Sequence, residues 1–145
     1  MESLTVAHMS SKIENCSIIN LPKIEDRRGN LSVIEENLHI PFGIEKTHWI
    51  YDVPGGQYRG GHAYKVQKEF IIALSGSFDV LVDDGREQKT FQLNRSYYGL
   101  YVPEGIWRKM NNFSTNALAM VLSSTGFSED DYIRDYAQFL ALKGL

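Results

Sequence analysis

The chain has 145 residues, of which 43% are hydrophobic and 23% charged, and its formal net charge is −3. This length suits one domain with a buried core, and the slight negative charge gives no overall attraction for nucleic acid or an anionic membrane. The single cysteine, Cys16, excludes an intrachain disulfide and fits a reducing cytoplasm. No stretch approaches the ~20 apolar residues of a membrane helix, and the first residues do not resemble a signal peptide. These features predict a cytoplasmic globular protein.

Residues 1–14 carry no strong pattern, so we expect a weakly ordered N-terminal extension followed by a single domain over residues 15–145. Gly, Pro, Asn and Asp recur at intervals of roughly ten residues, which is typical of a β-sandwich or barrel. The dense apolar run 69–74 indicates a strand buried on both faces. The strands that we expect cover residues 32–35, 47–53, 69–74, 78–82, 88–93, 99–102 and 117–123.

The turn between two of these strands is the clearest local signal. Asp83-Asp84-Gly85 separates the segments 78–82 and 88–93. An Asp-Gly pair favours the tight turns that connect antiparallel strands. We therefore expect a β-hairpin at this point.

One helix is expected at the C-terminus. Ser128 and Asp131 have the spacing of a capping box, which marks a helix start. Apolar residues then recur with helical spacing, namely Tyr132, Ile133, Tyr136, Phe139 and Leu140. Such a helix would cover one side or end of the barrel.

Two groups of residues carry a family resemblance. The first group is His62, Tyr64, Glu69 and Gly76, and the second is Gly99, Pro103, Gly105, Arg108 and Asn111. Their order and spacing resemble the two sequence motifs of cupin barrels, except that Tyr64 and Arg108 replace two of the usual histidines. The resemblance implies an all-β fold, a small cupin or jelly-roll barrel with a C-terminal α-helix.

The two motifs also bear on metal binding. Typical metal-binding cupins build their site from three histidines and a glutamate, and here Tyr64 and Arg108 occupy two of those four positions. Arg108 stays protonated at any physiological pH and repels a cation. We therefore expect no metal at this site.

His62 and Tyr64 are the candidate catalytic residues. His62 follows Arg59-Gly60-Gly61 at the start of a barrel strand, where it can point into the mouth and act as a general base near neutral pH. Tyr64 lies two residues further and faces the same side. Its hydroxyl could donate or relay a proton, orient His62, or fill the barrel interior. The alternative for His62 is a hydrogen-bonded residue of the strand without a catalytic role.

Arginines and aromatic residues are the candidates for substrate binding. Arg28, Arg59 and Arg108 could bind phosphate oxygens bidentately, which suits a phosphorylated or nucleotide-linked substrate. The alternative is ordinary surface charge. Tyr51 and Tyr101 belong to a set of aromatic residues that could stack on a base or sugar, although several of the set must lie in the core. His48 could face into the barrel or away from it.

A series of short segments extends the resemblance over nearly the whole chain, from about residue 20 to the C-terminus. These segments are Arg28-Gly29-Asn30-Leu31, Glu35-Glu36-Asn37, Pro41-Phe42, Arg59-Gly60-Gly61-His62-Ala63, Leu81-Val82-Asp83-Asp84-Gly85, Gly99-Leu100-Tyr101-Val102 and Asp131-Tyr132-Ile133-Arg134-Asp135-Tyr136. In this order they resemble the sugar 3,4-ketoisomerases, cupin-fold enzymes that act on dTDP-4-keto-6-deoxyglucose. The ordered set is far more specific than any one segment.

The resemblance implies a domain-swapped homodimer with no metal and no organic cofactor. It implies transfer of a carbonyl from C-4 to C-3 of a dTDP-linked 6-deoxyhexose, ahead of an aminotransferase that makes a 3-amino sugar for a surface glycan such as lipopolysaccharide. Carried over by position, the first histidine of the family's His-x-His pattern is His62, and the arginine before it is Arg59. The position of Arg108 varies in the family between histidine and arginine, and this choice accompanies differences in C-4 stereochemistry.

Tyr64 departs from the family pattern, which has a second histidine there. Three explanations stay open: Tyr64 acts as the second acid, His62 performs both proton transfers, or the chain is impaired. Other functions also remain, namely a non-catalytic nucleotide-sugar-binding module, an epimerase of a related sugar, and a metal-dependent cupin, for which most ligands are lacking.

Overall fold

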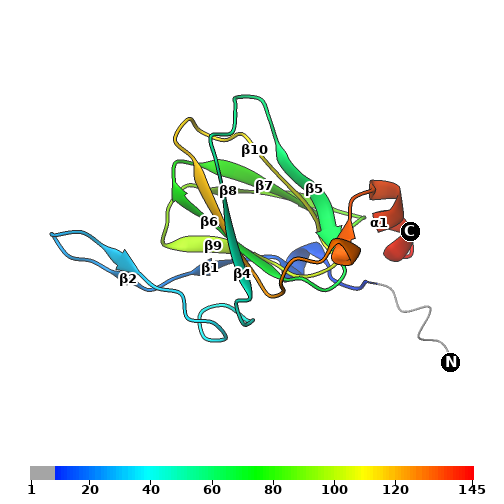
Figure 1. The fold of residues 1–145 in the computed structure, drawn as a ribbon, viewed down its shortest axis with the longest axis horizontal. Helices are drawn as coiled ribbons and strands as arrows, with labels where there is room; N and C mark the ends of the chain where they lie inside the picture. The colour runs from blue at the N-terminus through cyan, green and yellow to red at the C-terminus, as the bar shows by residue number, and fades with distance from the viewer. Residues whose placement is uncertain (1–8) are drawn as a thin grey trace.

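The computed structural model describes residues 9–145. They form a barrel of two five-stranded antiparallel sheets with a short helix at one end (Figure 1). The expected all-β barrel with a C-terminal α-helix is therefore confirmed. No helix in this part of the chain is both long and apolar enough to span a membrane.

The first sheet has the strand order β1-β9-β6-β11-β4. Its strands are β1 (Ser17–Asn20), β9 (Tyr98–Val102), β6 (Glu69–Ser75), β11 (Leu118–Ser123) and β4 (Lys46–Tyr51). β6 is buried on both faces, as the apolar run predicts. Ile71 and Ala73 face the barrel interior, while Phe70 and Ile72 lie under loop residues on the outer face.

The second sheet has the strand order β12-β5-β10-β7-β8. Its strands are β12 (Tyr132–Ile133), β5 (Arg59–Tyr64), β10 (Trp107–Asn111), β7 (Phe78–Asp83) and β8 (Gln88–Leu93). Alternate residues of β7 are buried, as expected for a strand with one face on the core. Val80 and Met110 from this sheet pack with Ile71 and Val121 from the first, so the main core fills the space between the sheets.

The predicted hairpin is confirmed, because β7 and β8 pair along their whole length. The backbone N–H of Gly85 donates to Asp83 Oδ1 over 2.6 Å. Gly85 has a φ of +95°, a conformation that a side chain would strain. The aspartate of this turn thus supplies a hydrogen-bond acceptor, and the glycine supplies the positive φ that the turn requires.

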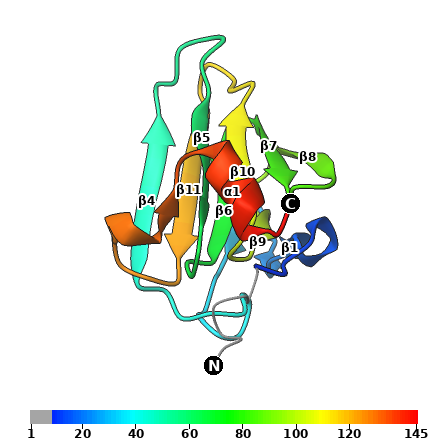
Figure 2. The same cartoon turned by 90° about the vertical axis from the view of Figure 1, so that its right-hand side faces the viewer.

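The predicted start of the C-terminal helix is wrong. Helix α1 runs only over Tyr136–Leu142, and Ser128 makes no side-chain cap bond. A 3-10 turn, η3, covers Glu129–Asp131, and the next two residues form β12, which pairs with β5. The Asp131 carboxylate accepts the backbone N–H groups of Val66 and Gln67 at 2.8 and 3.0 Å, so it anchors this segment to the loop after β5 instead of capping a helix. Figure 2 shows α1 lying across the end of the barrel.

The predicted strand 32–35 is also largely wrong. Only Leu31–Ser32 is extended, as β3, and it pairs with β2 (Lys23–Ile24) in a separate two-stranded sheet. This hairpin projects away from the barrel as an arm (Figure 1). Ile24 and Leu31 on the arm are 57% and 55% exposed, so the arm buries little apolar surface within its own chain.

The first eight residues of the predicted N-terminal extension lie outside the described part of the chain. From Met9 onward the chain contacts the barrel end: Met9 packs beside α1, and its N–H donates to the carbonyl of Leu142 at 3.2 Å. The 3-10 turn η2 (Ile13–Asn15) follows, with the N–H of Ile13 donating to Asp84 Oδ2 at 2.8 Å.

Candidate active site

A cavity of about 530 Å³ opens at the mouth of the barrel. It lies between β4 of the first sheet, β5 and β10 of the second, and the segment that leads into β12. The lining residues are Lys46, His48, Ile50, Tyr58, Arg59, Gly60, His62, Tyr64, Arg108, Phe127, Tyr132 and Arg134. The lining contains four cationic side chains and no carboxylate.

β5 places His62 and Tyr64 on the same face, two residues apart. His62 Nε2 lies 3.0 Å from the Tyr64 hydroxyl, and the two rings meet edge to face at 4.9 Å between centroids. The hydroxyl can donate to Nε2 or accept from it, depending on which imidazole nitrogen carries the proton. Tyr64 therefore contacts His62 directly.

The glycine before this pair makes room for a neighbouring side chain. Gly60 has a φ of +95°, and a Cβ built there would lie 2.9 Å from Arg108 Nη1 and 3.1 Å from the Arg108 carbonyl oxygen. Any larger residue would be strained and would also displace the guanidinium. The glycine thus allows β5 to approach β10 at the point where Arg108 enters the cavity wall.

Arg108 forms a buried ion pair with Glu69. Arg108 Nε and Nη2 donate to the two Glu69 oxygens at 2.8 and 2.9 Å, and the side chains are only 3% and 1% exposed. Gln67 Nε2 donates to Glu69 Oε2 at 3.1 Å, and the Thr125 hydroxyl donates to Gln67 Oε1 at 2.8 Å. Burial alone would raise the pKa of Glu69, but the Arg108 charge and hydrogen bonds outweigh it and lower the pKa. Both partners are therefore ionised, and the guanidinium is held in one orientation.

This environment keeps His62 and Tyr64 uncharged. Burial, followed by the charge of Arg108, lowers the pKa of His62 to about 3. Burial, followed by the charge of Glu69, raises the pKa of Tyr64 above its ordinary value. At neutral pH the site therefore presents a neutral imidazole that can accept a proton and a neutral hydroxyl that can donate a hydrogen bond.

The C-terminal segment closes one side of the cavity. The Tyr132 ring lies 5.1 Å from His62 and 4.8 Å from Tyr64 between centroids. The Arg134 guanidinium lies 4.0 Å from the centre of the Tyr132 ring and pairs with Glu129 at 2.9 Å. β12 is only two residues long, so its place depends on the Asp131 anchor described above.

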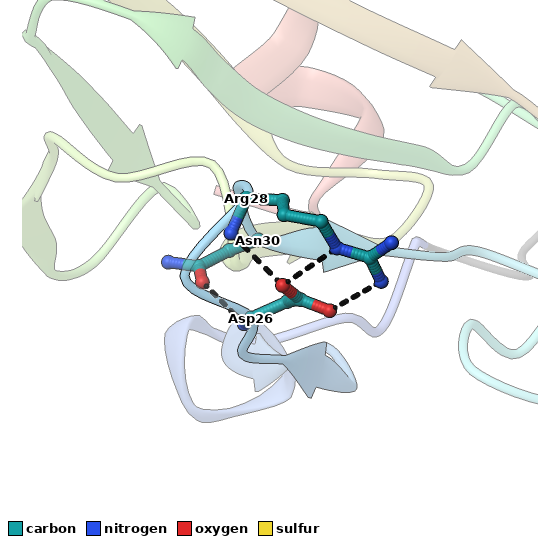
Figure 3. A network of polar contacts seen from close by, with 3 residues as sticks. All are labelled: Asp26, Arg28 and Asn30. Carbon is teal, nitrogen blue, oxygen red and sulfur yellow. Dashed lines mark hydrogen bonds and ion pairs between the residues drawn. The ribbon is translucent and has the colours of Figure 1, made fainter.

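Four of the predicted site residues come together at this cavity: His62, Tyr64, Arg59 and Arg108. Arg28 does not, because it lies in the turn of the β2–β3 arm. Its side chain is 85% exposed and pairs with Asp26 at 2.8 Å, while Asn30 Oδ1 accepts the N–H of Asp26 (Figure 3). Within this one chain, the arm holds Arg28 outside the cavity.

Tyr51 and Tyr101 also lie outside this cavity, and strand alternation explains both placements. Tyr51 is on the outward face of β4, where it is 60% exposed. Tyr101 faces outward from β9, because Leu100 and Val102 on either side of it fill the core. It packs beside Phe42 at 6.2 Å between ring centroids.

Several lining residues were not singled out as site residues from the sequence. They are Lys46, Tyr58, Phe127, Tyr132 and Arg134, together with His48, whose direction the sequence left open. The alternation of β4 was visible in the sequence, but not which of its faces points inward. The structure shows that His48 faces the cavity.

Comparisons with known proteins agree with this geometry. The family model described as "FdtA: WxcM-like, C-terminal" matches residues 14–144. The TDP-4-oxo-6-deoxy-alpha-D-glucose-3,4-oxoisomerase of Aneurinibacillus thermoaerophilus is 42% identical over 122 residues, which cover 84% of this chain and 88% of that protein.

Solved structures give the same result. A 3,4-ketoisomerase from Helicobacter canadensis has a TM-score of 0.87 at 38% identity, covering 90% of this chain and 98% of that one. The TDP-quinovose 3,4-ketoisomerase of Campylobacter jejuni has a TM-score of 0.85 at 40% identity, covering 89% and 99%. A ketoisomerase of Thermoanaerobacterium thermosaccharolyticum, solved in complex with TDP-4-keto-6-deoxyglucose, has a TM-score of 0.87 at 32% identity, covering 90% and 94%. The chain therefore belongs to the cupin-fold family of sugar 3,4-ketoisomerases, and it is an enzyme of that class.

Proposed function

We propose that this protein converts dTDP-4-keto-6-deoxyglucose into a dTDP-3-keto-6-deoxyhexose by acid–base proton transfer. The observation that carries this proposal is the neutral His62, held 3.0 Å from the Tyr64 hydroxyl beside the buried Arg108. Family membership supplies the reaction class, and this cluster supplies the groups that the reaction needs.

The net reaction removes one proton from C-3 and adds one to C-4, and it removes one proton from O-3 and adds one to O-4. The C-4 carbonyl acidifies the hydrogen on C-3, so His62 can remove it and leave an enediolate. Protonation of C-4, with loss of the O-3 proton and gain of one on O-4, then gives the 3-keto sugar. Tyr64 and Arg108 stabilise the negative charge on the oxygens, and such interactions are stronger in a site that excludes water.

The charge of the cavity supports an anionic substrate. Glu69 neutralises Arg108, and Glu129 neutralises Arg134. No carboxylate of residues 9–145 lies within ion-pair distance of Lys46 or Arg59, the other two cations of the lining. They are therefore the groups proposed to attract the diphosphate of the nucleotide sugar.

The test is to incubate the purified protein with dTDP-4-keto-6-deoxyglucose in deuterated water and follow the sugar by NMR. A 3-keto product with deuterium at C-4 is expected, and its coupling constants would give the C-4 configuration. His62→Asn should abolish the reaction. Binding of dTDP by the unmodified protein without turnover would instead identify a non-catalytic binding module or an impaired enzyme.

We also infer that the protein works as a domain-swapped homodimer in which the β2–β3 arms are exchanged. An isolated two-stranded hairpin is only marginally stable in water, and the apolar Ile24 and Leu31 need a partner surface. The exposed edge strand β4, which carries Trp49 at 59% exposure, offers such a surface. An exchanged arm would bring Arg28 to the other protomer.

Sedimentation equilibrium tests the dimer. Unmodified protein should sediment as a dimer, and Leu31→Lys should shift it towards the monomer. Leu145→Lys, at an exposed leucine of the C-terminus, is the matched control and should leave the dimer intact. A monomeric unmodified protein at assay concentrations would refute the inference.

We also infer the next reaction of the product. A 3-keto group is the substrate that an aminotransferase needs to make a 3-amino sugar, so coupling to such an enzyme should yield the amino sugar.

We propose a cytoplasmic location for the protein. The single thiol, Cys16, which is buried and free, supports it. Cell fractionation should recover the protein with the cytoplasmic fraction.

A further inference from the structure

We propose that His48 on β4 is a second catalytic imidazole, which delivers the proton to C-4 after His62 has removed the proton from C-3. The inference rests on the proposed isomerase function and deepens it. The chain has lost one imidazole from β5, at Tyr64, but the cavity still contains two histidines.

Strand geometry places His48 in the cavity. Lys46, His48 and Ile50 line it, while Thr47, Trp49 and Tyr51 on the alternate positions of β4 are exposed. β4 belongs to the first sheet and β5 to the second. The two imidazoles therefore enter one cavity from two different sheets, whereas a His-x-His pair on one strand would present both from the same wall.

The surroundings of His48 leave its imidazole available for chemistry. No hydrogen bond or ion pair involves its side chain within residues 9–145, and it is half-buried. The charged groups around it are Glu69, Arg108, Lys46 and Arg59. Burial, opposed by the charge of Glu69, lowers the pKa of His48, so the resting imidazole is neutral at neutral pH. It must therefore first take a proton from solvent at the open mouth of the cavity and then give that proton to C-4, while His62 returns the C-3 proton to solvent.

Tyr64 is less suited to this second transfer. Its raised pKa makes the hydroxyl a poor source of a full proton, although it remains a good hydrogen-bond donor. It is also already engaged with His62 Nε2 at 3.0 Å. The tyrosine is thus a partner of the first base, and the proton for C-4 comes from the other wall.

The division of labour can be measured with two rates in deuterated water: exchange of the C-3 hydrogen, and formation of the 3-keto product. His62→Asn should lose both. His48→Asn should keep C-3 exchange within about threefold of the unmodified protein, while product formation falls by about 100-fold or more, the usual contribution of one acid–base group. His39→Asn, on the loop before β4, is the matched control and should change neither rate.

Two results with the His48→Asn variant would refute the inference. Product formation by His48→Asn within about threefold of the unmodified rate would show that His48 transfers no essential proton. Equal loss of both rates would assign His48 to substrate binding or to the first step. dTDP affinity by calorimetry and the thermal midpoint verify that the variant is folded and binds. If the unmodified protein shows neither exchange nor product, the proposed function itself fails, and the role of His48 fails with it.

Discussion

Glu69→Gln removes the counter-charge of a guanidinium that has almost no access to water. Both side chains of the Glu69–Arg108 pair are at most 3% exposed, and two hydrogen bonds of 2.8 and 2.9 Å join them. Breaking a buried pair from one side costs roughly 3–5 kcal/mol, because the remaining charge is left uncompensated. In a domain of this size, that corresponds to a fall in melting temperature of roughly 6–20 °C.

The assay is thermal unfolding, with denaturant unfolding to obtain the free energy. Glu129→Gln is the matched control, because Glu129 also holds an arginine through two hydrogen bonds but in an exposed position. It should leave the midpoint nearly unchanged, since exposed ion pairs add little stability. Replacing Glu69 and Arg108 together by methionine should recover most of the loss.

The effect of Glu69→Gln should also depend on pH. The pKa of Glu69 is lower in the folded than in the unfolded protein, so the unfolded state binds the proton first as the pH falls. The stabilisation is therefore complete above the unfolded pKa of about 4.3 and is lost as the pH falls through the folded value. A loss no larger than that of Glu129→Gln at pH 7 would refute the reasoning about the buried charge.

Four further predictions concern the same region. Gly60→Ala should lower the free energy of unfolding by about 1–3 kcal/mol and reduce turnover, because Gly60 has a positive φ and its Cβ would contact Arg108. The control is Gly55→Ala, whose Cβ would have nothing within 4 Å and which should change neither quantity. Thermal unfolding and the isomerase assay measure both variants. The pH profile of kcat/KM should show no loss from His62 protonation between pH 8 and 5, because the pKa is about 3; a limb near pH 6.5 would contradict this. Stability should nevertheless decrease below about pH 6.5 in denaturant titrations, since only the unfolded state then protonates His62. Asp131→Ala should cost about 1–2 kcal/mol by freeing two backbone N–H groups, and unchanged unfolding would show that the anchor is dispensable.

Much of the fold was predictable because the signals were local. The Asp83-Asp84-Gly85 turn and the apolar run of β6 depend on residues next to one another in the chain. The helix boundary was not predictable, because Asp131 finds its partners at Val66 and Gln67, more than sixty residues away. Tyr132 and Ile133 fit a helical spacing, but pairing with β5 decides their conformation.

The sequence predicted the part of the site that lies on β5 and β10. Spacing alone places His62 and Tyr64 on one face, and the cupin resemblance places Arg108 towards them. Residues contributed by other elements, such as His48 and Arg134, required knowing which strands surround the mouth. The position of Arg28 was not predictable either: its segment resembles the family, but the β2–β3 arm projects away from the barrel and from this chain's own cavity (Figure 1).

The buried pair also constrains how a metal site could be built into this barrel. Arg108 supplies, from within the chain, the positive charge that a metal ion supplies in a typical metal-binding cupin. Assembling three histidines and a glutamate here takes two changes, Tyr64→His and Arg108→His. Changing Arg108 alone leaves Glu69 buried without its cation, and changing Tyr64 alone keeps a guanidinium where the ion must bind. In this chain, therefore, neither change alone would create a metal site, and replacing Arg108 alone would also reduce the stability of the barrel.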